Sequence, residues 1–217
     1  WTPVRLRPLV EEGSILRRAR DAGRSVAFAN AYPRGWPGPR GGRRIAGPPL
    51  AARGAGVLDR HEEALGVGDA VSSEIVNDGW KRHLGHDWLP DVTPAQAGAN
   101  LARVAAQHDL TLYAHYTTDT AGHRGRMPGA VEALERVDAF FSGLVNELEN
   151  DTVLVVASDH GNIEDVRAGH TLNPALGVIA RATESIASGG GETALDPLPT
   201  DLREVTPFIL RALNVTS

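Results

Sequence analysis

The stretch Thr152-Val-Leu-Val-Val-Ala157 is apolar or β-branched throughout and runs directly into Ser158-Asp-His-Gly-Asn162. Six such residues predict a strand that is buried on both faces, as in a parallel sheet. Polar side chains that directly follow a strand of an open α/β sheet lie at its carboxyl edge, where such sheets bind their ligands. The stretch therefore predicts a fold class and the location of a functional site.

The flanking segments continue an alternation of helices and strands. Apolar residues between Val131 and Leu148 recur at intervals of three and four, which predicts a helix with one apolar stripe. Further strands are predicted at 25–30, 110–116 and 176–180, and further helices at 11–22, 93–108 and 201–213. This order predicts an α/β sandwich with a mostly parallel sheet flanked by helices.

One part of the chain interrupts this alternation. Residues 31–56 are dense in Pro, Gly and Arg and show neither a helical nor a strand period, which favours an irregular excursion from the core. We expect residues 1–30 and 106–217 to form the α/β core. Residues 31–105 are expected to form an insertion or a small cap region.

Composition narrows the classes of partner. With 22 Lys and Arg against 27 Asp and Glu, the net charge is −5, so there is no global basic field to recruit nucleic acid. No apolar run approaches the roughly 20 residues of a membrane span. The chain has no cysteine, which excludes disulfides and zinc–thiolate sites and suits a reducing, cytoplasmic location. A small molecule is the expected partner, and any metal must be bound through oxygen and imidazole.

Asp and His residues follow two of the predicted strands, and a further His precedes a third. Asp159 and His160 follow the apolar strand, Asp119 and His123 follow the strand at 110–116, and His170 comes shortly before the strand at 176–180. Each element alone is compatible with a turn, a salt bridge or an exposed histidine. Together, carboxylates and imidazoles at neighbouring strand ends indicate a site for two divalent ions.

The donor chemistry also indicates the metals. Carboxylate and imidazole without sulfur suit manganese or zinc, or magnesium with water. Glu164 and Asp165 are expected to orient the imidazoles from outside the ligand set.

These residues resemble a known family. The resemblance is to the metal-binding motifs of cofactor-independent phosphoglycerate mutase and related metalloenzymes of the alkaline phosphatase superfamily. It rests on three motifs, Asp119-x3-His123, Asp159-His160-Gly161-Asn162 and His170-Thr171-x-Asn173-Pro174. By that resemblance, Asp119, His123 and His170 would bind one metal, Asp159 and His160 would bind the second, and the fold would be the alkaline-phosphatase-like sandwich.

The resemblance also implies a reaction. A Ser or Thr would attack a small phosphate ester in line while two cations stabilise the phosphoryl group, in a phosphatase or a phosphomutase. In the family, that nucleophile and a further Asp ligand lie on a leading segment, which we expect upstream of Trp1, so the chain alone is expected to be nearly inactive. Because only 118 residues precede Asp119, we favour a smaller relative over a true phosphoglycerate mutase. The alternatives are a sulfatase or phosphodiesterase of the same superfamily, or a non-catalytic metal-binding α/β domain.

Four arginines in the Pro- and Gly-rich excursion are candidates for binding the substrate. Guanidinium groups make planar bidentate contacts to phosphate or carboxylate. The alternative is a solvated loop in which charge serves solubility. The four residues are Arg34, Arg40, Arg43 and Arg44.

Overall fold

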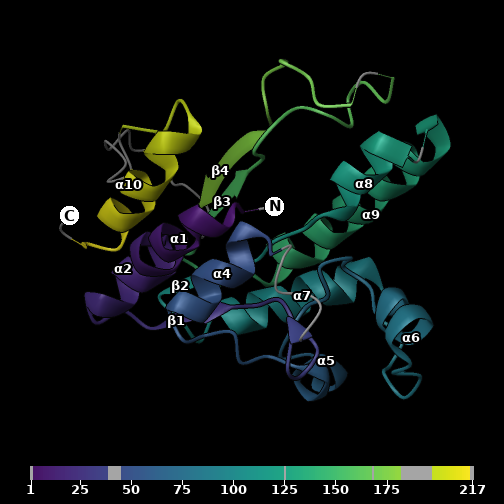
Figure 1. Ribbon diagram of the computed structural model, residues 1–217, viewed down its shortest axis with the longest axis horizontal. Coiled ribbons are helices and arrows are strands. Elements are labelled where there is room, and N and C mark those ends of the chain that lie inside the picture. The colour runs from purple at the N-terminus through teal and green to yellow at the C-terminus, as the bar shows by residue number, and fades with distance from the viewer. Residues whose placement is uncertain (1, 39–44, 125, 168, 182–196, 216–217) are drawn as a thin grey trace.

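The structure is a computed structural model that describes residues 2–38, 45–124, 126–167, 169–181 and 197–215. Helices predominate and surround two short strand pairs (Figure 1). The elements in chain order are η1 (Val4–Leu6), α1 (Arg7–Gly13), α2 (Ile15–Asp21), β1 (Val26–Phe28), α4 (Gly47–Gly54), α5 (Glu62–Val67), α6 (Asp78–Leu84), α7 (Pro94–Ala105), β2 (Leu110–Leu112), α8 (Thr117–Arg124), α9 (Arg126–Glu147), β3 (Val153–Ala157), β4 (Gly177–Arg181) and α10 (Leu202–Ala212).

Strand β1 lies between two layers of helices. It pairs in parallel with β2, with Val26 opposite Leu110. Because successive residues of a strand face opposite sides, Ala27 belongs to one buried cluster and Phe28 to another. This pair therefore has the two covered faces that are typical of parallel sheets.

Each face of β1 has its own apolar core. The first cluster joins β1 to α7 and α9, and its buried members include Ala27, Ala29, Leu101, Val104, Phe140 and Leu144. The second joins β1 to α2, α4 and α10, and its buried members include Leu16, Ala19, Phe28, Ala51, Ala52 and Leu210. Residues 31–105 contribute to both clusters, through α4 and α7. The division into a core and an insertion stays a prediction.

Helices α7 and α9 cross with their backbones in contact. A Cβ atom on Gly98 of α7 would lie 2.1 Å from the carbonyl oxygen of Phe140, and one on Gly143 of α9 would lie 2.0 Å from that of Ala95. Only glycine fits such a close approach. Helix α8 packs against α9 in turn, so this crossing supports the helix that carries the first pair of candidate ligands.

Strands β3 and β4 form a separate antiparallel pair, with Val153 opposite Arg181 and Ala157 opposite Gly177. A mixed α/β fold is thus confirmed, but the described residues do not show a mostly parallel sheet. A parallel connection needs a crossover, which is usually a helix, and the described part of 158–176 contains none. β3 is half-buried rather than buried on both faces.

Most of the predicted elements are present within a few residues of their expected bounds. The expected helix at 11–22 is divided into α1 and α2 at Ser14, whose hydroxyl accepts a hydrogen bond from the backbone N–H of Arg17 and caps α2. Among the described helices, none combines the length and the apolar character that crossing a membrane requires.

Candidate metal centre

Helix α8 presents two candidate ligands on one face. Asp119 and His123 are four residues apart, so their side chains lie one above the other along the helix. The sequence placed both residues at the rim after the strand, and the structure adds that they lie on a helix that begins at Thr117. Asp119 lies in the first turn, where a carboxylate interacts favourably with the helix dipole.

Two loop segments between β3 and β4 bring the other candidate ligands to this face. The backbone N–H of Thr171 donates to the carbonyl of Gly161 over 2.9 Å, which joins the segment that carries His160 to the segment that carries His170. The contact requires glycine, because a Cβ on Gly161 would lie 2.3 Å from the Thr171 hydroxyl oxygen. The rings of His160 and His170 consequently stack with centroids 3.7 Å apart.

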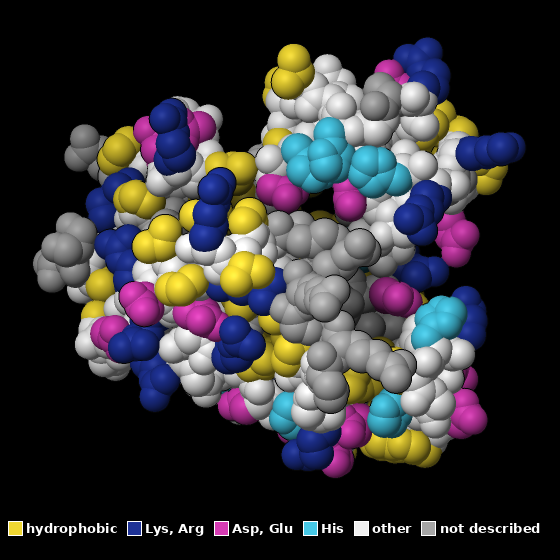
Figure 2. Space-filling model, in the orientation of Figure 1, with side chains coloured by type: hydrophobic (Ala, Val, Ile, Leu, Met, Phe, Trp, Pro, Cys, Tyr) yellow, Lys and Arg dark blue, Asp and Glu magenta, His cyan; other side chains and the backbone are white. Residues whose placement is uncertain are grey.

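Three imidazole nitrogens surround the Oδ1 oxygen of Asp119. The Nε2 atoms of His123 and His170 each lie 3.4 Å from this oxygen, and that of His160 lies 3.8 Å from it. Asp159 joins the group through its Oδ1 atom, 3.6 Å from Nε2 of His160. The structure therefore brings four of the five predicted ligands around one oxygen, whereas Asp159 contacts only its chain neighbour His160. Figure 2 shows histidine side chains gathered on the surface with acidic side chains beside them.

These spacings fit a shared cation better than they fit hydrogen bonds. An N–H···O hydrogen bond spans about 2.7–3.2 Å, so contacts of 3.4–3.8 Å are too long. Ligand atoms that are each about 2.1 Å from one tetrahedral ion lie about 3.4 Å from one another. One ligand atom from each of Asp119, His160 and His170 forms a group within 4.8 Å. The donor set thus fits a divalent ion.

The tightest group differs from the grouping that the resemblance implied. His160 was assigned to the second metal with Asp159, yet it lies near Asp119 and stacks on His170. Which residues share an ion stays a prediction. The Asp119 carboxylate is 47% exposed and the His170 side chain is 56% exposed, so a substrate can reach the centre from solvent.

Asn162 holds the central carboxylate in place. Its Nδ2 group donates to Oδ1 of Asp119 over 2.7 Å and to the backbone carbonyl of the same residue over 3.1 Å. Asn162 is only 4% exposed, and Gly122 of α8 makes room for it: a Cβ there would lie 2.3 Å from Oδ1 of Asn162. In the sequence, Asn162 stands within a motif that indicates no role for it, and no local pattern points to Gly122.

The two neighbouring carboxylates do not contact the imidazoles as expected. Glu164 accepts hydrogen bonds from the hydroxyl of Thr171, from Nδ2 of Asn173 and from the backbone N–H of Asn162. The hydrogen bond from Thr171, followed by the others, lowers the pKa of Glu164 to about 2. Asp165 pairs instead with Arg167, whose hydrogen bonds lower the pKa of Asp165 to about 2.

Tyr116, directly before α8, is a polar neighbour that the sequence pattern did not single out. Its hydroxyl is buried and makes no hydrogen bond of ordinary geometry among the described residues, although the Tyr32 side chain lies near enough to lower the pKa of Tyr116 against the effect of burial. Burial raises the pKa of Tyr116, and the nearby charge of Asp159 acts in the same direction. The hydroxyl therefore stays neutral beside the acidic part of the centre.

The candidate arginines are only partly covered by the structure. Arg34 pairs with Glu63 over 2.8 Å, and its backbone N–H donates to Glu62 over 3.1 Å. These contacts favour the solvated-loop interpretation for this residue. Arg40, Arg43 and Arg44 lie outside the described residues.

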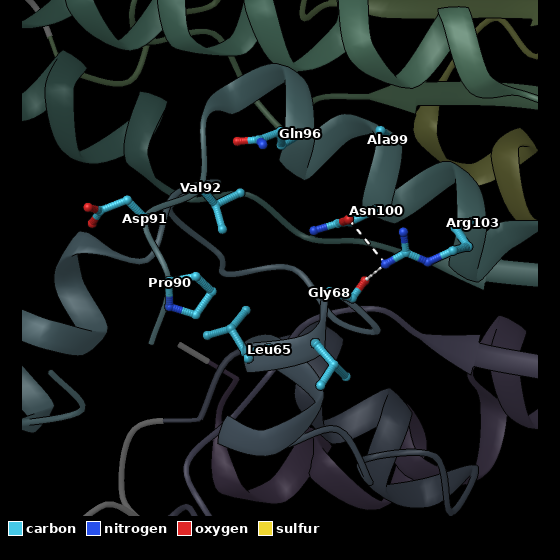
Figure 3. A pocket seen from close by; sticks show the side chains of 11 residues that line it. Leu65, Gly68, Pro90, Asp91, Val92, Gln96, Ala99, Asn100 and Arg103 are labelled. Atoms are coloured by element: carbon cyan, nitrogen blue, oxygen red, sulfur yellow. Dashed lines mark hydrogen bonds between the residues drawn. The ribbon is translucent and has the colours of Figure 1, made fainter. Parts of the chain in front are cut away.

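A pocket of about 290 Å³ lies elsewhere, between α5, the 90–92 segment and α7 (Figure 3). Its guanidinium group, from Arg103, already donates to the carbonyl of Gly68 and to Oδ1 of Asn100. None of the five candidate ligands lines this pocket. The exposed Asp and His centre is therefore the better candidate for the functional site.

The mixed α/β fold carries a donor set of Asp and His that fits a divalent ion, and comparison with known proteins identifies the superfamily. The sequence profile of the Metalloenzyme superfamily matches residues 88–206, which is more than half of the 217-residue chain. The chain belongs to this superfamily.

The similar curated proteins include several enzymes called 2,3-bisphosphoglycerate-independent phosphoglycerate mutase. That of Ehrlichia canis is 30% identical over 118 residues, which cover 50% of this chain and 22% of the relative. That of Myxococcus xanthus is 32% identical over 120 residues, 46% of this chain and 23% of the relative. That of Chloroflexus aggregans is 31% identical over 133 residues, which cover 54% of this chain and 24% of the relative. The match thus spans about a quarter of each relative, and no solved structure matches the chain significantly.

Proposed function

We propose that this chain provides the metal-binding centre of a phosphoryl-transfer enzyme that uses two divalent ions, manganese or zinc, or magnesium. Its substrate would be a small phosphate ester, and its reaction that of a phosphatase or a phosphomutase. The proposal is supported by the superfamily and by the similarity to phosphoglycerate mutases over part of their length.

One observation carries the proposal. Oδ1 of Asp119 lies 3.4–3.8 Å from three imidazole nitrogens, at the spacing of ligands around an ion, in a centre open to solvent. Hydroxyl-rich or purely carboxylate clusters would not favour borderline metals in this way.

The protein groups have distinct tasks in this proposal. The carboxylate of Asp119 offers negative charge, held in orientation by the amide of Asn162. The histidines offer Nε2 lone pairs, which requires their neutral form. Divalent ions bound there would neutralise charge on the phosphoryl group and on the attacking and leaving oxygens. Roles for Arg40, Arg43 and Arg44 in binding the substrate stay predictions.

The test uses the full-length protein. After chelation, manganese and zinc uptake are measured by calorimetry, and turnover is measured with a phosphate monoester, a phosphate diester and a sulfate ester. We expect two ions per chain and metal-dependent turnover of the monoester. His170→Ala should lose both, whereas His83→Ala, which removes an exposed histidine of α6, should lose neither.

Each other outcome overturns a stated part of the proposal. Absence of manganese and zinc uptake refutes the metal centre. If the protein prefers the diester or the sulfate ester, it is a phosphodiesterase or a sulfatase rather than a phosphatase or a phosphomutase. Tight metal binding without any turnover, together with unfolding of His170→Ala, favours a non-catalytic domain with a structural ion.

A further inference from the structure

Glu164 connects the two loop segments that carry His160 and His170. Its Oε2 atom accepts from the backbone N–H of Asn162 over 2.6 Å, within the first segment. Its Oε1 atom accepts from Nδ2 of Asn173 over 3.0 Å and from the hydroxyl of Thr171, both in the second segment. The carboxylate of Glu164 thus connects the two loop segments.

The other contacts between these segments are few. Each follows an irregular path, and among the described residues two backbone hydrogen bonds join them, from Thr171 to Gly161 and from Ser158 to Leu176, each over 2.9 Å. Two such bonds, without a continuous ladder, leave the segments some freedom to move relative to each other. Hydrogen bonds from both segments to one carboxylate remove that freedom, and bonds to an ionised acceptor are stronger than neutral ones.

The connection reaches the central carboxylate as well. Glu164 fixes the backbone of Asn162, and the side chain of Asn162 donates to Asp119 over 2.7 Å. In the described part of the chain, Glu164 forms no hydrogen bond or ion pair with an imidazole, so its effect on the ligands is indirect.

We propose that Glu164 is the positioning residue of the metal centre: by bridging the two loop segments it sets the spacing between His160, His170 and Asp119. This inference rests on the proposed metal-binding function and says which residue holds the ligands in place before a metal binds. The low pKa of Glu164, caused first by the Thr171 hydroxyl, keeps the carboxylate ionised at neutral pH.

The chain offers a closely matched control. Asp165 is the next residue and its pKa is also held at about 2, but it pairs with Arg167 within its own segment and does not reach the second one. Asp165→Asn therefore removes a similar charge at nearly the same place without cutting the connection between segments.

The experiment compares Glu164→Ala, Glu164→Gln and Asp165→Asn with the wild type in the full-length protein. Manganese and zinc affinities are measured by calorimetry after chelation, because loss of a residue that orients metal ligands costs about 10–100-fold in affinity. We expect a loss in that range for Glu164→Ala and a smaller one for Glu164→Gln, whose amide oxygen still accepts on one side. Asp165→Asn should bind metal as the wild type does.

A second measurement needs no metal. In the chelated protein, proton NMR should show close approach of the His160 and His170 rings, whose centroids are 3.7 Å apart. We expect Glu164→Ala to lose this ring contact while circular dichroism shows that it remains folded without metal. Glu164→Gln gives the same comparison if the alanine variant fails to fold.

Distinct results overturn distinct statements. If the wild type binds no metal, the proposed function is wrong, and the ring contact alone decides the role of Glu164. If the wild type binds metal and the Glu164 variants bind it equally well, Glu164 is not a positioning residue. An equal loss in Asp165→Asn would also refute the proposal, because it would show a general effect of charge.

Discussion

Gly122→Ala should weaken metal binding without adding or removing a ligand. Gly122 lies in the middle of α8, and an added Cβ would lie 2.3 Å from Oδ1 of Asn162, against at least 3.4 Å for an ordinary contact. The amide must therefore move by about 1 Å, which stretches its 2.7 Å hydrogen bond to Asp119 beyond hydrogen-bond range. Asn162 is 4% exposed and cannot turn to water instead.

The expected magnitude follows from the bond that is lost. A hydrogen bond to a charged group contributes about 1.5–3 kcal/mol. Since about 1.4 kcal/mol corresponds to a factor of ten, metal affinity should fall about 10–100-fold. Alanine itself is favoured over glycine inside a helix by about 1 kcal/mol, so the fold should not suffer from the change in the backbone.

The assay is calorimetric titration of the chelated full-length protein with manganese. Gly129→Ala is the matched control, because Gly129 lies in α9 and a Cβ there would meet nothing within 4 Å. The reasoning also requires that Gly122→Ala add no further loss once Asn162→Ala is present, since both act through one side chain. Wild-type affinity in a folded Gly122→Ala variant, or full additivity with Asn162→Ala, would refute it.

Three further predictions concern stability, pH and metal removal. Gly98→Ala forces a Cβ to within 2.1 Å of a carbonyl oxygen of α9 and should lower the free energy of unfolding by about 1–3 kcal/mol in denaturant titrations; an unchanged midpoint would contradict the close helix crossing. Because the pKa of Glu164 falls from 4.5 to about 2 on folding, its ionised form stabilises the protein above about pH 4.5, and this contribution disappears as the pH falls through 2. The difference in melting temperature between metal-free wild type and Glu164→Gln should accordingly shrink below about pH 4.5, and a constant difference would argue against the carboxylate. Free metal at about 100 times its dissociation constant should raise the free energy of unfolding by about 2.7 kcal/mol, an increase that chelation removes and that His170→Ala should not show.

Elements whose signals are local were predictable from the sequence. Helix α7 begins at the capping box of Thr93 and Gln96, in which each side chain bonds the other residue's backbone, and this pattern is legible in four residues. The apolar stripe of α9 and the β-branched run of β3 are equally local. Serine is a common N-cap, so Ser14 also carried a local signal, but the helical period on both sides of it predicted one continuous helix instead of α1 and α2.

The direction of β4 could not be predicted in the same way. A strand of Gly177–Arg181 has the same composition whether it runs parallel or antiparallel to β3. Its direction depends on the path of residues 158–176, which return without a described helix and are pinned by the bridge between Gly161 and Thr171. Such a contact between two loops has no periodic signature.

In the candidate site, too, residues with a local signal were predictable and residues that act through distant contacts were not. The five ligands were predictable because carboxylates and imidazoles at strand ends have a recognisable chemistry. Asn162 and Gly122 are 40 positions apart in the chain, and their fit appears only when α8 meets the loop after β3. An asparagine and a glycine are common in loops and helices for other reasons, so neither could be assigned a role from sequence alone.

Helix geometry holds two of the ligands, whereas hydrogen bonds between loop segments hold the others. Asp119 and His123 are held by helical geometry on α8, which packs on α9. His160 and His170 come from irregular segments that are joined by the hydrogen bonds of Glu164 and by two backbone hydrogen bonds. Substitutions behind α8 should therefore act through stability, whereas substitutions in the loops should act on metal affinity with little effect on the fold. Since the loop histidines account for two of the three nitrogens around Asp119, residues outside the ligand set control the geometry of most of the centre.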